Sequence, residues 1–374
     1  MFGMIITTSH ASLVNGKIVE APANTVVEIL SAKKTPFVFI RHSMEGRRTS
    51  TVYDYDNGCL VREYRLPVLR WSILRYITEV IATTSVMFFR RFSRPLVFIG
   101  VDPLNALAGI LLRKLGKVQH AVFYCADYTK QRFANRWLNA AYHTLDRWCA
   151  RHADVVWSVS TRIVNERKTM GLPDNKNVFV PNIPSSAYEP FVGNPRNSQR
   201  LITLGVLGDQ LDFIGIIAAV EVLAKEMPQL TLAIIGTGPK EEELKQEVLR
   251  RHLENRIQFL GYLTHDRALE EISKSGIGLA LYNGNWSFNY YGDSMKCREY
   301  FCFGLPVITT DTHSTVEDIR AENAGVVCDM KPEAYVHAIR TILSNYETYS
   351  RHALACAKKH ENVHAKLIDA LLAL

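Results

Sequence analysis

The sequence contains no CxxC pair of cysteines. Its seven cysteines are an odd number and are scattered along the chain: Cys59, Cys125, Cys149, Cys297, Cys302, Cys328 and Cys356. This pattern indicates neither a zinc site nor a disulfide framework. A reducing cytoplasm is the compartment that fits such cysteines best.

Low-complexity tracts and fixed-period repeats are also missing. The apolar start, residues 1–8, has no basic residues before it and no small-residue cleavage site, so it predicts a first strand rather than a signal peptide. The 374 residues, of which 47% are hydrophobic and 22% charged, are enough for two globular domains.

Charge is distributed unevenly along the chain. Residues 1–190 hold 25 Lys and Arg against 14 Asp and Glu, a net charge of +11, and the remainder has a net charge of −4. A basic first half suggests an anionic partner, such as nucleic acid, a phospholipid surface or a lipid-phosphate acceptor. Because no nucleic-acid motif accompanies the charge, we expect one of the last two.

Short apolar runs alternate with helical patterns in both halves, which predicts an α/β fold with parallel sheets covered by helices. Residues 181–199 contain four prolines together with Asn, Ser and Gly, and they form the best candidate linker. We therefore expect two Rossmann-like domains, residues 1–185 and residues 196–357, that face a cleft. The strandless tail is predicted to be helical, and its last part, about residues 358–374, to pack back on the first domain.

The most specific segment is Asp293-Ser-Met-Lys-Cys-Arg-Glu-Tyr-Phe-Cys-Phe-Gly-Leu-Pro-Val-Ile308. Asp293 and Ser294 are both good N-cap residues, and Gly304 is a typical helix end. Lys296 and Glu299 lie three residues apart, so the predicted helix presents them on one face. Taken alone, the pair could be an ordinary surface ion pair.

This segment resembles the signature of the group 1 glycosyltransferases and their GT-B relatives, in which K-x-x-E-Y/A precedes G-x-P-V. The resemblance implies the GT-B architecture, two doubly wound parallel-sheet domains, with a nucleotide-diphosphate sugar of the UDP or GDP type held by the second. It implies that Glu299 binds the donor ribose and that Lys296, or the helix start at Asp293 and Ser294, lies near the diphosphate or the sugar. Many family members carry a second glutamate eight residues earlier, where this chain has Tyr291.

Three further segments resemble the family. Gly205 and Gly208 follow the first strand of the second domain, where glycine lets the backbone approach a phosphate; tight packing of strand and helix is the alternative. Gly236 follows the second strand, but the dinucleotide fingerprint fails because Glu241 and not glycine completes it, which argues against NAD. Tyr262 and Thr264 follow the next strand. In the family this segment contacts the nucleobase of the donor; a simple turn after a buried strand is the alternative.

The first half offers weaker candidates for an acceptor site. Asp127 lies just after the strand expected at residues 121–124. In some inverting GT-B relatives an aspartate at this place serves as the catalytic base; a turn-capping role is the alternative. His10 follows the first strand at a position expected to face the cleft, although a solvated loop histidine explains it as well. Arg41 and His42 end another strand and are candidates for binding an acceptor phosphate.

Residues 69–94 interleave aromatic and aliphatic residues with arginines. The apolar core of this segment is too short for a clear membrane span and contains Glu79. A basic helix of this kind can lie in a bilayer interface, with Arg90, Arg91 and Arg94 toward the lipid headgroups. A core helix of the first domain with arginines at its ends is the alternative, and the two are compatible.

These observations favour a glycosyltransferase that needs neither a metal nor a cofactor and works on a glycan or lipid-linked acceptor. We expect it to be cytoplasmic, peripheral at the inner face of the membrane, and without a nucleic-acid partner. Two alternatives remain at this stage: a GT-B-fold nucleotide-sugar epimerase, and a non-catalytic protein that binds a nucleotide sugar or phospholipid.

Overall fold

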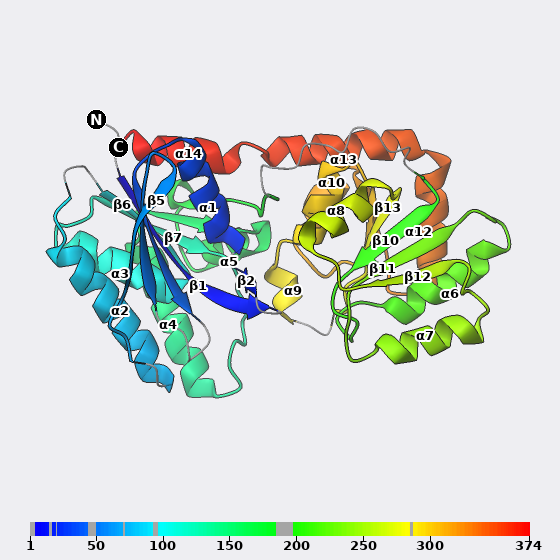
Figure 1. Cartoon of the computed structure of the whole chain (residues 1–374), viewed down its shortest axis with the longest axis horizontal. Helices are drawn as coiled ribbons and strands as arrows, with labels where there is room; N and C mark the ends of the chain where they lie inside the picture. Colours follow the sequence, from blue (N-terminus) through cyan, green and yellow to red (C-terminus); the bar gives the residue numbers. More distant parts are fainter. Residues whose placement is uncertain are drawn as a thin grey trace. The chain divides into compact units, whose positions relative to one another are not determined.

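The computed structural model describes residues 4–14, 17–19, 21–43, 50–69, 72–92, 96–184, 197–284 and 287–374. The chain divides into two compact units (Figure 1). Unit 1 comprises Met1–Pro181 and Asn362–Leu374, and unit 2 comprises Asn182–Glu361. The first boundary thus falls at the start of the expected linker, and the C-terminal segment that belongs to unit 1 begins at Asn362.

Unit 1 is built on one nine-stranded sheet in the order β5-β4-β3-β1-β6-β7-β8-β9, with β2 paired to β1. Its strands are β1 (Met4–Val14), β2 (Lys17–Val19), β3 (Phe37–Ser43), β4 (Thr51–Asp56), β5 (Cys59–Arg65), β6 (Leu96–Val101), β7 (His120–Cys125), β8 (Val155–Ser158) and β9 (Asn177–Phe179). The six strands from β3 to β9 in this order are parallel to one another. β6 is buried throughout, as expected for a sheet covered on both faces.

The otherwise parallel sheet of unit 1 contains antiparallel pairs that the sequence did not predict. β4 pairs antiparallel to both β3 and β5, and β2 pairs antiparallel to β1. Asn57 and Gly58 join β4 to β5 with φ of 49° and 78°, the left-handed conformation that a tight hairpin turn requires. β5 itself was not predicted, because as an exposed edge strand it lacks a clear apolar pattern.

The helices of unit 1 are α1 (Ala21–Ala32), α2 (Ser72–Phe89), α3 (Pro103–Lys114), α4 (Arg136–His152), α5 (Thr161–Thr169) and α14 (Val363–Leu372), with the 3₁₀ turn η1 (Asp174–Lys176). α2 packs against α3 and α3 against α4, so the three helices form one layer (Figure 1). The last helix, α14, packs against α1. His364 Nε2 lies 2.8 Å from the Tyr124 hydroxyl, which ties α14 to the sheet.

Unit 2 has a six-stranded, wholly parallel sheet in the order β12-β11-β10-β13-β14-β15. Its strands are β10 (Arg200–Leu204), β11 (Thr231–Ile235), β12 (Ile257–Gly261), β13 (Ile277–Ala280), β14 (Val307–Thr309) and β15 (Gly325–Val327). The predicted strands of the second half all match these positions to within a few residues, because each is a short apolar run between polar turns.

Helices cover both faces of the unit 2 sheet (Figure 1). One core joins the sheet to α6 (Phe213–Ala224), α7 (Glu241–Arg250) and α12 (Pro332–Ser344). The other joins it to α8 (His265–Ser273), α10 (Met295–Cys302), α11 (Val316–Glu322) and α13 (Tyr346–His360). The short helix α9 (Ser287–Tyr291) precedes α10. The doubly wound arrangement predicted from the sequence is therefore present in each unit.

Candidate functional site

Three neighbouring strands of unit 2 end in glycine. Gly205, Gly236 and Gly261 stand at the carboxyl ends of β10, β11 and β12, and their φ values are 156°, 129° and 67°. A Cβ on Gly236 would lie 1.8 Å from the carbonyl oxygen of Gly205, so the two turns are packed backbone on backbone. Ligands of doubly wound sheets bind at this edge, where glycine places no side chain over the backbone. The N–H groups of Gly205 and Gly236 themselves donate to the carbonyl oxygens of Ile235 and Gly261 and so link the three turns.

Helix α10 begins at the same edge. Ser294 is its N-cap, and its Oγ accepts a hydrogen bond from the backbone N–H of Cys297. Lys296, in the first turn, places its Nζ 3.3 Å from the Tyr282 hydroxyl. A Cβ built on Gly205 would lie 3.8 Å from the same Nζ, so the lysine sits beside the glycine turn. An ammonium group, a helix N-terminus and a glycine turn together form a site suited to an anion.

Glu299 lies on the next turn of α10 and is only 7% exposed. Burial raises the pKa of its carboxyl group to about 7, against the opposing effect of the positive charge on Lys296. Its Oε1 is 4.0 Å from Nδ1 of His265, beyond hydrogen-bond distance. A buried carboxylate with a raised pKa is more typical of a functional group than of a structural ion pair.

The segment after β12 contains Tyr262, Thr264 and His265. Tyr262 is 52% exposed, and Thr264 is the N-cap of α8 without a capping bond from its side chain. His265 begins α8 and faces Glu299, as its 4.0 Å distance shows. Sequence reasoning missed His265, because nothing in its local pattern distinguishes it from a surface histidine at a helix start.

The carboxylate of Asp293, a candidate for donor binding, contacts other residues of the chain. Its carboxylate pairs with the Arg298 guanidinium at 2.9 Å and accepts hydrogen bonds from the Thr315 hydroxyl and the Asn182 backbone N–H, both at 2.8 Å. Its side chain is buried, and Arg298 also pairs with Asp318 at 2.7 Å. These contacts occupy the carboxylate fully, so Asp293 anchors the helix start instead of facing a donor.

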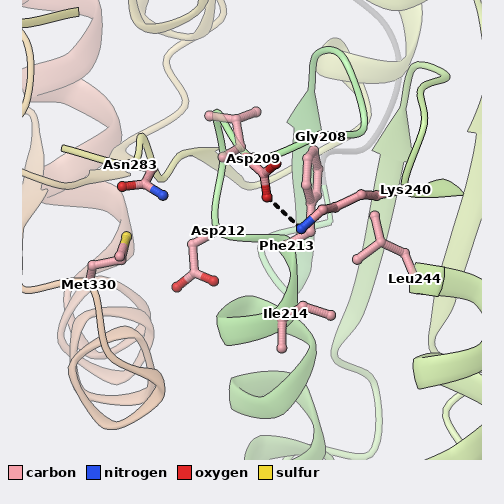
Figure 2. Close-up of a pocket in the computed structure, with 10 residues that line it drawn as sticks. Gly208, Asp209, Asp212, Phe213, Ile214, Lys240, Leu244, Asn283 and Met330 are labelled. Carbon is pink, nitrogen blue, oxygen red and sulfur yellow. Dashed lines mark ion pairs between the residues drawn. The ribbon is translucent and has the colours of Figure 1, made fainter. Parts of the chain in front are cut away.

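A pocket is lined by residues of the loop that follows β10 and by neighbouring segments (Figure 2). Gly208 lines it together with Asp209, Asp212, Lys240 and Asn283. The ammonium group of Lys240 is paired with the carboxylate of Asp209, and Asp212 caps α6 by accepting from the Gly215 N–H at 2.9 Å. With two carboxylates and one ammonium group, this pocket is not basic. A diphosphate therefore has better partners on the side of Lys296.

A buried polar cluster lies at the carboxyl edge of the unit 1 sheet. His10 Nδ1 is 2.6 Å from Asp102 Oδ2, and His10 Nε2 is 3.0 Å from Glu79 Oε2. Burial by itself lowers the pKa of His10, but the two carboxylates outweigh it and raise the pKa to about 9. His10 is therefore not a solvated loop residue: β1 continues through it to Val14. Asp102 has φ 77° and ψ 166°, which is strained for a residue other than glycine.

The structure also changes the interpretation of Arg41 and His42. His42 is 1% exposed, and its ring nitrogens lie 2.8 Å from the Ser50 hydroxyl and 3.2 Å from the Thr83 hydroxyl. Burial lowers its pKa well below the usual value, so the ring is neutral and enclosed and is not a phosphate ligand. Arg41 stacks on the Tyr53 ring, with its guanidinium carbon 4.7 Å from the ring centroid.

Asp127 lies just beyond the carboxyl end of β7. Its carboxylate is half exposed and pairs with Arg132 at 2.8 Å. It is not the N-cap of α4, a position taken by Asn135. An exposed carboxylate at a strand end remains open to a ligand, but the arginine would have to turn aside or share the ligand.

The segment predicted to meet a membrane forms α2. Arg90 pairs with Asp54 at 2.6 Å and lies 3.4 Å from the Tyr64 hydroxyl, so it supports β4 and β5. Arg91 is exposed, and Arg94 falls outside the described residues. No helix in the described part of the chain is long and apolar enough to cross a membrane.

Two family models match the chain. The model described as glycosyl transferases group 1 matches residues 187–359, and the glycosyl transferase 4-like domain model matches residues 25–183. Together they cover both units.

Relatives and solved structures agree with these models. A poly(glycerol-phosphate) alpha-glucosyltransferase of Bacillus subtilis (strain 168) is 23% identical over 215 residues, 55% of this chain and 30% of the relative. A GDP-mannose-dependent alpha-(1-6)-phosphatidylinositol dimannoside mannosyltransferase of Mycobacterium tuberculosis is 30% identical over 132 residues, 35% of this chain and 31% of the relative. The matched regions thus span less than a third of either relative.

The fold is shared with Anabaena Alr3699/HepE, whose crystal structure is in complex with UDP. The two chains superpose with a TM-score of 0.67 at 12% identity, and the match covers 100% of each chain. The two family models, which together match residues 25–183 and 187–359, show that the chain is a glycosyltransferase made of a glycosyl transferase 4-like domain and a group 1 domain.

Proposed function

We propose that the protein transfers a sugar from a nucleotide-diphosphate sugar, of the UDP or GDP type, to a glycan or lipid-linked acceptor. The observation that supports this most is Glu299, a buried carboxylate whose pKa is raised even though the positive charge of Lys296 acts on it. A carboxylate can accept two hydroxyl hydrogen bonds at once, as a ribose offers them. The ribose hydroxyls would donate hydrogen bonds to this carboxylate, in addition to its long ion pair with His265 at 4.0 Å.

The neighbouring residues have matching roles in this proposal. The ammonium group of Lys296 and the N-terminus of α10 at Ser294 stabilise the diphosphate, in the ground state and as it departs. Gly205 and Gly236 let the backbone approach the phosphates. Tyr262 stacks on the nucleobase of the donor, and the backbone near Thr264 forms hydrogen bonds with the edge of that nucleobase. These groups provide the charge stabilisation that transfer needs, so we propose that it is independent of metal.

The acceptor is assigned to unit 1, with Asp127 as the candidate base for its hydroxyl. The half-exposed position of this carboxylate at the end of β7 supports the assignment. The names of the two curated relatives give acceptors that contain phosphate, a poly(glycerol phosphate) and a phosphatidylinositol glycolipid. A basic first half with a net charge of +11 suits such an acceptor at the cytoplasmic face of a membrane.

Product analysis after incubation with UDP- or GDP-sugars and isolated membranes tests this function. Transfer of labelled sugar to an acceptor, undiminished by EDTA, is the expected result. Isomerised donor would instead support an epimerase, and binding without turnover would support a non-catalytic binding protein. Loss of transfer in EDTA, restored by a divalent cation, would contradict the metal-independent part of the proposal.

A further inference from the structure

The outer surface of the α2–α3–α4 layer of unit 1 is unusually apolar. On α2, the side chains of Leu74, Ile77 and Ile81 recur at helical spacing and are all at least half exposed, and Phe89 at its end is 80% exposed. On α3, the partly exposed residues include Leu104, Leu107 and Leu111, again at helical spacing. Amphipathic surface helices normally place polar residues at such positions.

Helix α4 adds basic and aromatic residues to the same layer. Trp137 is 74% exposed at its first turn, with the Arg136 guanidinium carbon 5.1 Å from its ring centroid. Arg147 and Arg151 are exposed farther along the helix, and Lys114 is exposed at the end of α3. Within the described part of the chain, no carboxylate forms an ion pair with Arg136, Arg147, Arg151 or Lys114.

Exposed carboxylates are missing from these three helices. Their sequences contain two acidic residues, Glu79 and Asp146. Both are buried, Glu79 beside His10 and Arg75, and Asp146 against the guanidinium of Arg167. The outer sides of α2, α3 and α4, which we call the helical face, therefore combine apolar side chains with positive charge and carry no exposed negative charge.

We propose that the helical face docks on an anionic lipid bilayer, with the apolar stripes of α2 and α3 in the interface and the arginines of α4 on the lipid headgroups. This deepens the proposed function, on which it rests, by identifying the surface that meets the membrane. Charge complementarity favours anionic lipid, and exposed leucine, isoleucine and tryptophan favour a bilayer over a purely polar polyanion.

The topology links this face to the acceptor site. α3 begins directly after Asp102 and α4 begins a short loop after Asp127, so the N-terminal ends of both helices lie at the carboxyl edge of the sheet. Leu104 and Trp137 are thus at the same edge of unit 1 as the candidate base. A headgroup held at the bilayer surface by this face would lie near the strand ends where the acceptor is expected.

Sedimentation of the full-length chain with vesicles tests the proposal. Phosphatidylcholine vesicles containing phosphatidylglycerol should pellet the wild-type protein, pure phosphatidylcholine vesicles should do so weakly, and added salt should release it. The double variant Arg147→Gln and Arg151→Gln should weaken binding by more than tenfold, since each basic residue near such a surface contributes about a fivefold factor. The charge-matched control Lys34→Gln and Lys168→Gln, on exposed positions outside the helical face, should bind as the wild type does.

A second pair of variants tests the apolar contribution. Ile77→Ser with Ile81→Ser should weaken vesicle binding at least tenfold, while the matched change of the exposed unit 2 residues Val222 and Leu249 to Ser leaves it unchanged.

Three results would overturn the proposal. The wild-type protein binds neither kind of vesicle, the control variants lose as much binding as the variants of the helical face, or single-stranded RNA binds while vesicles do not. Calorimetry with UDP and GDP, without vesicles, tests donor binding separately from membrane docking. If a nucleotide still binds when docking fails, only the docking proposal is contradicted.

Discussion

The side chain of His10, within β1, meets that of Asp102, which directly follows the adjacent parallel strand β6, with His10 Nδ1 2.6 Å from Asp102 Oδ2. The second ring nitrogen of His10 reaches Glu79 on α2, so one imidazole joins β1, β6 and a covering helix. Because the pKa of His10 is raised to about 9, the ring is protonated at neutral pH and lies between two carboxylates.

This cluster makes the stability of the protein dependent on pH. The folded-state pKa of about 9 exceeds the usual value of 6.5, so the stabilisation is complete below about pH 6.5 and is lost as the pH rises through 9. Between pH 7 and pH 9 the wild type should lose about 2 kcal/mol of unfolding free energy that His10→Gln does not lose. Urea unfolding of both proteins at the two pH values measures this, and parallel pH dependences would contradict it.

Two glycines of unit 2 should respond differently to alanine. Gly236→Ala places a Cβ 1.8 Å from a backbone oxygen at a φ of 129°, so it should destabilise unit 2 by more than about 2 kcal/mol. Gly208→Ala meets only Pro239 Cγ at 4.0 Å and should change stability by less than about 1 kcal/mol. Thermal unfolding of the two variants compares them, and equal melting temperatures would refute the close approach of the two turns.

The buried pair of Asp293 and Arg298 should matter for folding and not for the donor. Arg298→Met leaves the Asp293 carboxylate buried without its cation, which costs about 3–5 kcal/mol. The double variant Asp293→Leu with Arg298→Met should recover part of that loss. Asp293→Asn, in conditions where it is folded, should bind UDP or GDP within about twofold of the wild type. A loss of nucleotide affinity there, with stability intact, would restore the donor role predicted from the sequence.

Nucleotide binding should itself depend on pH. Burial raises the pKa of Glu299 to about 7, so its carboxyl group becomes protonated as the pH falls through 7. If only the ionised form binds the ribose, affinity should decrease by up to about tenfold from pH 8 to pH 6. Glu299→Gln should bind more weakly and show a smaller pH dependence, because it retains only the protonation of the phosphates. Identical pH profiles would exclude Glu299 as the titrating group.

Much of unit 2 was predictable because its signals are local. The cap at Ser294, the stop at Gly304 and the spacing of Lys296 and Glu299 specify α10 and one of its faces, and all are found in the structure. The edge strand β5 was missed although Asn57 and Gly58 are a strong hairpin signal, since its own residues do not alternate clearly.

The polar clusters could not be predicted, because they join residues that are distant in the sequence. Glu79 and Asp102 reach His10 across 69 and 92 residues. Asp293 looked like a ligand-binding acid at a helix start, and only the fold shows that Thr315 and Asn182 use up its carboxylate. Local pattern specifies which residues share a face, but it does not reveal which of them already have partners.

The central claim is that Glu299 binds the ribose of a nucleotide-diphosphate sugar, and isothermal titration of UDP and GDP into wild-type and Glu299→Ala protein tests it most directly. Loss of hydrogen bonds to a charged group costs about 1.5–3 kcal/mol, so Glu299→Ala should bind the preferred nucleotide about 10- to 100-fold more weakly with an unchanged melting temperature. Glu317→Ala, which removes a carboxylate from the first turn of α11 in the same unit, should bind like the wild type. Equal affinity of wild type and Glu299→Ala would contradict the account.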